Sequence, residues 1–413
     1  MSEAGRIRVL FMQSRPFFGA DTAIESQLMR YLQPMGVDVH AAVTTEAPAA
    51  GQVSTLGEVS KLPGVHVRPT SFGPSMYGSS GLARLRRLLS GASVPLNFAR
   101  LAQYARRNRI NVVHAKDKPR DAFYGVLLGR AAGARVIVHA HTAYGDWMSP
   151  LLKWALGQAD AIVAVSDFAA RSYLEAGYRS DRVRVVHNAL DISGWDPSID
   201  AAPVRAELGI KPDELVVGIV GRMYRWKGHG DLLNAVAMVS QNVPGVKVLV
   251  VGQDDVLLNE GRSYKADLEE QARRLGISSR VVFAGFRKDV DRLVAAMDVF
   301  ALPSWGDSFG MVYLEAMAMN KPCVAWTAGG APEVIETGRT GYVVPTGDVA
   351  ALAKALDALL VSPELRQRFG EEGRRRAETV FTPQRMSESM LSVYRSVLGR
   401  TQTSSATGRA ALA

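Results

Sequence analysis

The stretch from Pro303 to Pro322, PSWGDSFGMVYLEAMAMNKP, decides the fold of this chain. It follows a short apolar run, residues 299–302, which predicts a buried strand that Pro303 ends. A loop with two glycines comes next, and from Met311 onward apolar residues recur at helical spacing. Gly310 precedes the helix, whose free N–H groups and dipole favour an anion at that end.

Two acidic residues belong to the same stretch. Asp307 lies in the expected loop, and Glu315 lies one turn inside the expected helix. Two carboxylates beside a helix N-terminus suit a ligand with a polyol at one end and phosphate in the middle. The same pattern also fits an ordinary loop and helix of an α/β protein with two solvated acids.

Length and composition indicate a globular protein. The 413 residues are enough for two domains, and 47% are hydrophobic against 22% charged. The one cysteine, Cys323, excludes a disulfide framework and favours the reducing cytoplasm. The first residues do not have the pattern of a signal peptide, and no stretch reaches eighteen apolar residues, so we expect no membrane span.

The net charge of +9 is unevenly distributed. Residues 1–195 contain 23 Lys and Arg against 14 Asp and Glu, whereas residues 196–413 contain 26 of each kind. This excess predicts an anionic partner for the N-terminal half, namely a phospholipid surface, a phosphorylated acceptor or nucleic acid. A solvated basic face without a partner is the alternative. Residues 82–89 form a basic amphipathic pattern that suits an anionic membrane or a surface helix packed by its leucines.

Strand and helix patterns alternate along the whole chain and predict two doubly wound α/β domains with a cleft between them. We expect an N-terminal domain at residues 1–195, a linker at 196–203 and a C-terminal domain at 204–383. A final helix at 384–400 should pack back on the N-terminal domain, and residues 401–413 have the composition of a disordered tail.

Several polar residues follow expected strands. His139 and His141 end the strand that begins at residue 135; such a pair can bind zinc, but no third ligand is evident in the sequence, so a polar contact with a substrate is favoured. Arg222 and Lys227 follow the strand at 215–220 and could neutralise a pyrophosphate. Because the chain has neither a P-loop nor a GxGxxG motif, ATPase and dinucleotide dehydrogenase activities are disfavoured.

In combination, these motifs resemble those of the retaining GT-B glycosyltransferases of glycosyltransferase family 4. The matching segments are FGAD at 18–21, AVSDFAARSYLEAG at 164–177, HNALD at 187–191, GRMYRWKGHGDLL at 221–233, PSWGDSFGMVYLEAMAMNKPCVAW at 303–326 and GGAPEVIETGRTGYVVPTGD at 329–348. The resemblance implies two Rossmann-like domains, a nucleoside-diphosphate sugar bound mainly by the C-terminal one, an acceptor bound by the N-terminal one, and neither metal nor other cofactor.

The resemblance also implies roles for individual residues. Arg222 and Lys227 match the family's diphosphate-binding pair, and Glu315 matches the acid that holds the ribose hydroxyls. The remaining matches concern the donor sugar and its phosphates: the N–H groups near Gly310, Met311 and Val312, the active-site histidine His141, and Gly19 near the diphosphate. Asp307 stands where the family has a glutamate, and its expected role is to orient the donor sugar.

Three further departures concern the backbone: Phe18, Ala189 and Asn320 replace glycines of the family pattern. Asn tolerates a left-handed backbone best among non-glycine residues.

Several functions remain open on the sequence alone. The favoured one is retaining transfer of a sugar from a UDP- or GDP-linked donor to a lipid or lipid-linked glycan, in the cytoplasm or on the inner face of the membrane. Transfer to a soluble metabolite is the alternative. A nucleotide-sugar epimerase, a catalytically inactive binding protein and a nucleic-acid binder are further candidates, the last without a recognised nucleic-acid-binding module.

Overall fold

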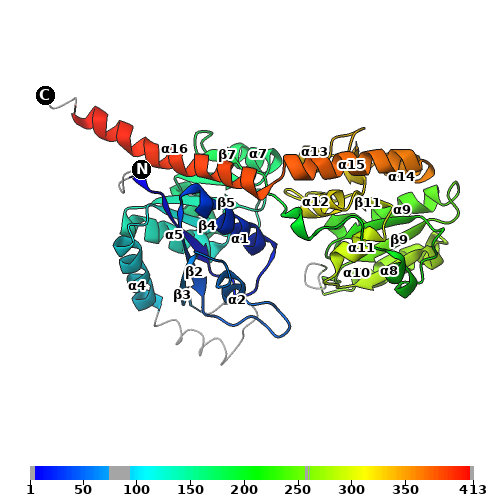
Figure 1. Ribbon diagram of the computed structural model, residues 1–413, viewed down its shortest axis with the longest axis horizontal. Helices are drawn as coiled ribbons and strands as arrows, with labels where there is room; N and C mark the ends of the chain where they lie inside the picture. The colour runs from blue at the N-terminus through cyan, green and yellow to red at the C-terminus, as the bar shows by residue number, and fades with distance from the viewer. Residues whose placement is uncertain (1–4, 74–93, 256–258, 260, 410–413) are drawn as a thin grey trace. The chain divides into compact units, whose positions relative to one another are not determined.

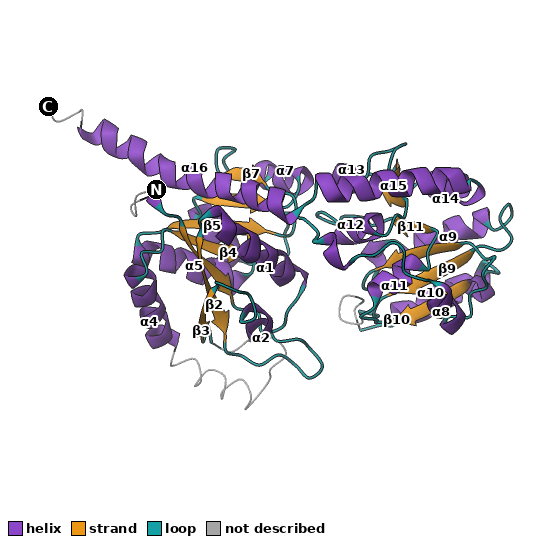
Figure 2. Ribbon diagram, viewed as in Figure 1, coloured by secondary structure: helices purple, strands orange, loops and turns teal. Residues whose placement is uncertain are grey.

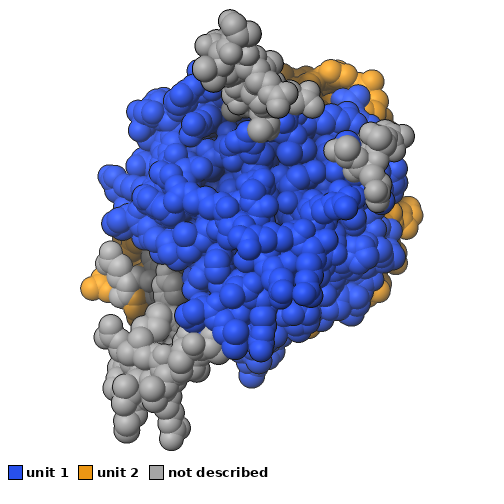
Figure 3. Space-filling view, turned by 90° about the vertical axis from the view of Figure 1, so that its left-hand side faces the viewer, with its two compact units in different colours: residues 1–187, 383–413 blue, residues 188–382 orange. Residues whose placement is uncertain are grey.

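The structure is a computed structural model, which describes residues 5–73, 94–255, 259 and 261–409, with side chains up to residue 399. The chain divides into two compact units. Unit 1 contains the residues up to His187 and those from Pro383 onward, and unit 2 is Asn188–Thr382. Figure 3 draws unit 1 in blue and unit 2 in orange.

Unit 1 is built on a parallel sheet of seven described strands in the order β3-β2-β1-β4-β5-β6-β7 (Figure 1). The strands are β1 (Arg8–Gln13), β2 (Asp38–Thr44), β3 (His66–Thr70), β4 (Val112–Lys116), β5 (Arg135–Ala140), β6 (Ala161–Ala164) and β7 (Val183–Val185). The helices are α1 (Ala20–Leu32), α2 (Thr55–Val59), α4 (Val94–Arg107), α5 (Pro119–Ala132), α6 (Pro150–Gln158), α7 (Asp167–Glu175) and α16 (Pro383–Arg409).

Unit 2 repeats this architecture with six described parallel strands in the order β10-β9-β8-β11-β12-β13. These are β8 (Val216–Val220), β9 (Lys247–Val251), β10 (Val281–Gly285), β11 (Val299–Leu302), β12 (Cys323–Trp326) and β13 (Gly341–Val344). The helices are α8 (Ala202–Glu207), α9 (His229–Val239), α10 (Tyr264–Arg274), α11 (Val290–Ala295), α12 (Met311–Ala318), α13 (Ala331–Val334), α14 (Val349–Val361) and α15 (Pro363–Thr379).

Helices flank the strands of both sheets (Figure 2), so central strands are buried on both faces. This explains why β8 and β11 are continuously apolar in sequence. In each sheet the strand order reverses once, between β1 and β4 in unit 1 and between β8 and β11 in unit 2. Open α/β sheets bind ligands at the carboxyl ends of the strands that flank such a reversal. The doubly wound fold predicted from the sequence is confirmed.

The unit boundary differs from the expected one. Residues 188–203, assigned from sequence to the end of the N-terminal domain and the linker, belong to unit 2. The backbone N–H of Leu190 donates to the carbonyl of Phe381, which joins the first and last residues of unit 2 near this boundary. The proline- and aspartate-rich composition of the region indicated a linker, but part of it forms helix α8.

The C-terminal helix is longer than expected. Helix α16 runs from Pro383 to Arg409, whereas the sequence analysis ended it at residue 400 and expected a disordered tail. Threonine and serine are weak helix formers, but extending an existing helix requires no new nucleation and residues 401–409 contain no proline. In unit 1, α16 lies beside α1 (Figure 1).

Two further predictions concern the backbone of Asn320 and contact with a membrane. Asn320 has a left-handed backbone with φ of 56°, as its place in the glycine position predicted. The amphipathic pattern at 82–89 lies outside the described residues. Within the described part of the chain, no helix is both long and apolar enough to cross a membrane.

Candidate active site

In unit 2, the predicted site residues follow the two strands that flank the reversal of strand order. Arg222 and Lys227 lie after β8, whereas Asp307 and Gly310 lie after β11. Strands β8 and β11 are hydrogen-bonded neighbours, so their carboxyl ends bring these residues to one edge of the sheet. The fold therefore groups a lysine, an arginine, an aspartate and a helix N-terminus where α/β sheets bind ligands.

The central contact of this group is an ion pair between two predicted site residues. The Lys227 Nζ lies 2.6 Å and 2.7 Å from the two carboxylate oxygens of Asp307. Both side chains are largely shielded, with exposed fractions of 16% and 21%. An anion that binds Lys227 must therefore compete with Asp307.

Arg222 also has an acidic partner. Its guanidinium donates to the carboxylate of Asp255 over 2.7 Å, but 64% of the Arg222 side chain is exposed. One guanidinium nitrogen of Arg222 is thus bound to Asp255, while most of the side chain remains exposed. The guanidinium can therefore shift from Asp255 to an incoming phosphate at small cost.

The two loops of the site are fixed by close backbone contacts. The N–H of Trp305 donates to the carbonyl of Trp226, which joins the loop after β11 to the loop after β8. Gly228 has φ of +70°, and a Cβ there would lie 1.9 Å from the carbonyl oxygen of Pro303. On the other side, the N–H of Gly330 donates to the carbonyl of Asp307. These contacts hold the Asp307 loop from both sides.

Helix α12 begins directly at the site. Gly310 is its N-cap, with φ of 84° and ψ of 65°, and supplies no side-chain cap. A Cβ at Gly310 would lie 2.4 Å from the ring of Tyr313, so only glycine fits this turn without displacement. The first N–H groups of a helix have no acceptor within it, and those of Met311 and Val312 belong to this set. This end of α12 is suited to an anion.

Glu315 lies further along α12 and is the only acid within that helix. Burial, without a compensating charge, raises the pKa of Glu315 to about 7. A desolvated carboxylate favours any ligand that donates hydrogen bonds to its ionised form, as a pair of vicinal hydroxyls would. The structure thus places a carboxylate suited to a diol on the same short helix as the anion-binding end.

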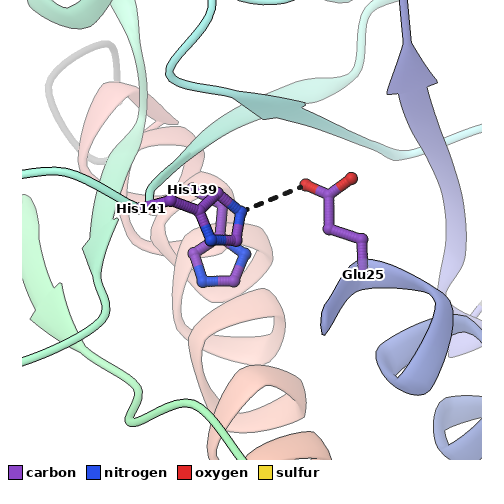
Figure 4. A group of neighbouring side chains, drawn as sticks. All are labelled: Glu25, His139 and His141. Carbon is purple, nitrogen blue, oxygen red and sulfur yellow. Dashed lines mark ion pairs between the residues drawn. The ribbon is translucent and has the colours of Figure 1, made fainter. Parts of the chain in front are cut away.

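In unit 1, Gly19 and His141 follow β1 and β5, which lie on either side of β4. Gly19 is the N-cap of α1, again without a side-chain cap. His141 is 8% exposed, and its ring centroid lies 4.3 Å from that of His139, with the two ring planes tilted by 39°. The His141 Nε2 lies 3.9 Å from Glu25 Oε1, as Figure 4 shows.

Glu25, His139 and His141 form a group whose ligand atoms lie within 4.8 Å of one another (Figure 4). Glu25 is thus a potential third ligand beside the two histidines, which was not evident in the sequence. The charge balance nevertheless disfavours a divalent cation here. The carboxylate of Glu25 already interacts with the buried ammonium of Lys116, so a metal ion would add two positive charges without a further anionic ligand.

Glu25, His114, Lys116 and Asp255 were not predicted from the sequence. Glu25 lies on the buried face of α1 with Leu28, Met29 and Leu32, and a charged residue in an apolar stripe was the signal that could have indicated it. His114 and Lys116 alternate within the fully buried strand β4, which is a comparable signal. No sequence pattern marks Asp255, because its pairing with Arg222 depends on how two loops approach each other.

Comparison with known proteins adds independent support for the fold and the family. Residues 26–193 match the family model described as Glycosyltransferase Family 4, and residues 200–376 match the one described as Glycosyl transferases group 1. The two matches are consecutive and together cover most of the chain.

Curated relatives include D-inositol 3-phosphate glycosyltransferases of mycobacteria. That of Mycobacterium marinum is 32% identical over 295 residues, which cover 68% of this chain and 60% of the relative. That of Mycobacterium sp. strain KMS is 35% identical over 250 residues, covering 58% of this chain and 55% of the relative. The matches thus span less than two thirds of these relatives' length.

Solved structures share the fold over nearly the whole chain. Anabaena HepE in complex with UDP has a TM-score of 0.76 at 23% identity, covering 94% of this chain and all of HepE. HepE with UDP and glucose has a TM-score of 0.74 at 25% identity, covering 95% and 100%. Sucrose-phosphate synthase from Thermosynechococcus elongatus has a TM-score of 0.72 at 22% identity, covering 96% and 100%. With both family models matched and the doubly wound architecture repeated in each unit, this chain belongs to the GT-B glycosyltransferases of family 4.

Proposed function

We propose that this protein transfers a sugar from a nucleoside-diphosphate donor to an acceptor hydroxyl with retention of anomeric configuration. The observation that carries the proposal is the group at the edge of the unit 2 sheet, where Arg222, Lys227 and the N-terminus of α12 follow neighbouring strands and Glu315 lies in the same helix α12. Such a group matches the alternation of anionic and hydroxyl-rich parts along a nucleotide sugar.

Each part of the donor has a partner in this group. The diphosphate interacts with Arg222, Lys227 and the helix N-terminus, and the ribose hydroxyls donate to Glu315. Asp307 faces the donor sugar once the diphosphate has drawn Lys227 away from it. We propose a UDP-linked donor, because HepE, which shares the fold, has been crystallised with UDP and UDP-glucose.

The chemistry follows from where charge develops. As the bond between the anomeric carbon and the diphosphate oxygen breaks, negative charge grows on the diphosphate. Two cations and a helix N-terminus placed at that point stabilise the charge. The acceptor oxygen bonds to the anomeric carbon on the same face, and its proton passes to the departing diphosphate. His141 in unit 1 is proposed to contact the donor sugar.

For the acceptor, the basic N-terminal half favours an anionic molecule. A phosphorylated polyol is one candidate, consistent with the D-inositol 3-phosphate glycosyltransferases among the relatives. An anionic lipid is the other, and an exposed apolar group near α6 supports it: Trp147, Leu151 and Trp154 are 61%, 41% and 38% exposed, with Arg130 and Lys153 nearby. Tryptophan beside basic residues suits a membrane interface. Cys323 is a free, buried thiol, which is consistent with the reducing cytoplasm. A membrane contact would then form on the cytoplasmic side.

Incubation with UDP- and GDP-sugars tests the proposal, first by the melting temperature and then by product analysis with acceptor. A donor-specific rise in melting temperature followed by transfer supports it. Formation of a new sugar nucleotide without acceptor would indicate an epimerase, and binding without transfer to any acceptor would indicate an inactive binding protein. Co-sedimentation with anionic vesicles that is lost in Trp147→Ala/Trp154→Ala would support the lipid acceptor over the soluble one.

A further inference from the structure

Glu25 is a fully buried carboxylate surrounded by nitrogen atoms. Its Oε1 lies 3.5 Å from Nε2 of His114 and 3.9 Å from Nε2 of His141, and the side-chain amide of Gln13 donates to its Oε2. Figure 4 shows Glu25 on α1 pointing across to His141 at the end of β5. Two histidines, His114 on β4 and His141 directly after β5, thus face the same carboxylate oxygen.

Glu25 is ionised in this setting. Burial alone would raise its pKa, but the neighbouring His114 and His141 rings and the charge of Lys116 hold the pKa well below its usual range. An ionised carboxylate only accepts hydrogen bonds. The Nε2 atoms of His114 and His141 face this carboxylate at 3.5 Å and 3.9 Å, and an ionised carboxylate at that position favours hydrogen on both of them, that is, the Nε2–H form.

Tyr394 of the C-terminal helix is consistent with that assignment. Its hydroxyl lies 2.7 Å from Nδ1 of His114, and its side chain is fully buried. Burial raises the pKa of Tyr394 well above its usual value, so the hydroxyl remains protonated and is able to donate. When Nε2–H of His114 faces Glu25, the Nδ1 of His114 can accept from this hydroxyl. In the Nε2–H form of His141, the Nδ1 atom carries no hydrogen and is an acceptor.

We propose that Glu25 is a positioning residue that fixes the tautomer and orientation of His141, and that Tyr394 acts on the same network through His114. The consequence is that α16, which is remote in sequence from every predicted site residue of unit 1, contributes to the geometry of His141. The effect on catalysis rests on the proposed function, whereas the tautomer assignment does not.

Nitrogen NMR of the full-length protein with labelled histidines tests the proposal directly, because the ¹⁵N shifts report which ring nitrogen carries hydrogen. The variants are Glu25→Gln and Tyr394→Phe, both close in shape to the native residue. Tyr104→Phe is the matched control, since the Tyr104 hydroxyl makes an equal 2.7 Å contact with Nδ1 of His40 on another part of unit 1.

We expect wild-type His141 to be in the Nε2–H form and Glu25→Gln to shift it toward a mixture of forms. Tyr394→Phe should alter His114 and shift His141 in the same direction by a smaller amount, while Tyr104→Phe should affect His40 alone. If transfer is observed, kcat should fall about tenfold or more in Glu25→Gln. A wild-type His141 in the Nδ1–H form, or an unchanged His141 in both Glu25→Gln and Tyr394→Phe, would overturn the proposal. Absence of transfer in the wild type would instead count against the proposed function and leave the tautomer result standing.

Discussion

Lys227 and Asp307 form a close ion pair, with the lysine Nζ 2.6 Å and 2.7 Å from the two carboxylate oxygens. The two residues are 80 positions apart and come from the loops after neighbouring strands β8 and β11. In this pair, Asp307 neutralises the ammonium group of Lys227, which we propose binds the donor diphosphate. Donor binding therefore requires exchange of one anionic partner of Lys227 for another.

Asp307→Asn should separate nucleotide binding from transfer. Removing the carboxylate frees Lys227, so we expect UDP to bind several-fold more tightly, in line with about 1 kcal/mol for a partly exposed ion pair. Transfer should fall, because the side chain that orients the sugar has lost its charge. Isothermal titration with UDP and a transfer assay measure the two effects. The control is Asp267→Asn, which breaks the exposed pair with Arg225 and should change neither. Weaker UDP binding by Asp307→Asn would contradict our inference that Asp307 and the diphosphate compete for Lys227.

Glu315 should make the stability of the free protein depend on pH. Its folded pKa is raised to about 7 from 4.5, so the folded state retains a proton that the unfolded state releases. Stability should thus fall as pH rises from 4.5 to 7 and change little from this group above pH 7.

Glu315→Gln should remove the free-energy cost of ionising this buried carboxyl group. Above pH 7 the free energy of unfolding should therefore rise by up to about 3 kcal/mol. We expect the melting temperature of Glu315→Gln to exceed that of the wild type at pH 8 and to match it near pH 4.5. The same variant should lose donor binding, because the ribose hydroxyls lose an ionised acceptor. A variant that is no more stable at pH 8 would show that Glu315 is not desolvated as the structure indicates.

Gly310→Ala should damage the site through the backbone. The residue has φ of 84°, and an added Cβ would lie 2.4 Å from the Tyr313 ring, so the turn that begins α12 must shift. Gly276→Ala is the control, since Gly276 has φ of 70° but nothing within 4 Å of an added Cβ. Both variants should lose about 1–2 kcal/mol of stability from backbone strain. Only Gly310→Ala should also weaken UDP binding by tenfold or more, as measured by titration.

The sequence predicted the fold well because buried parallel strands give continuous apolar runs. Strand β11 was predicted at residues 299–302, which are the bounds that the structure has. In contrast, β3 at His66–Thr70 lies at the edge of its sheet, is mostly exposed and contains a proline, so the apolar signal was missing. The short helix α2 at Thr55–Val59 was missed for a similar reason, since five residues are too few to show helical periodicity.

For the site, the sequence located residues but not their partners. Arg222, Lys227 and Asp307 were identified from their place after strands and from the resemblance to a known family. Their pairing with Asp255 and with each other depends on loop contacts that no local pattern encodes. Glu25 was missed because a glutamate in a helix is usually solvated, and only the packing around it shows that it is buried.

The most direct test of the central claim is the rate of sugar transfer by Lys227→Ala with a UDP-sugar that the wild type uses. If Lys227 stabilises charge on the departing diphosphate, kcat/KM should fall about a hundredfold or more. Lys354→Ala, which removes an exposed lysine of α14 in the same unit, should retain wild-type activity. Turnover by Lys227→Ala close to that of the wild type would contradict the assignment of this edge of the unit 2 sheet as the donor site.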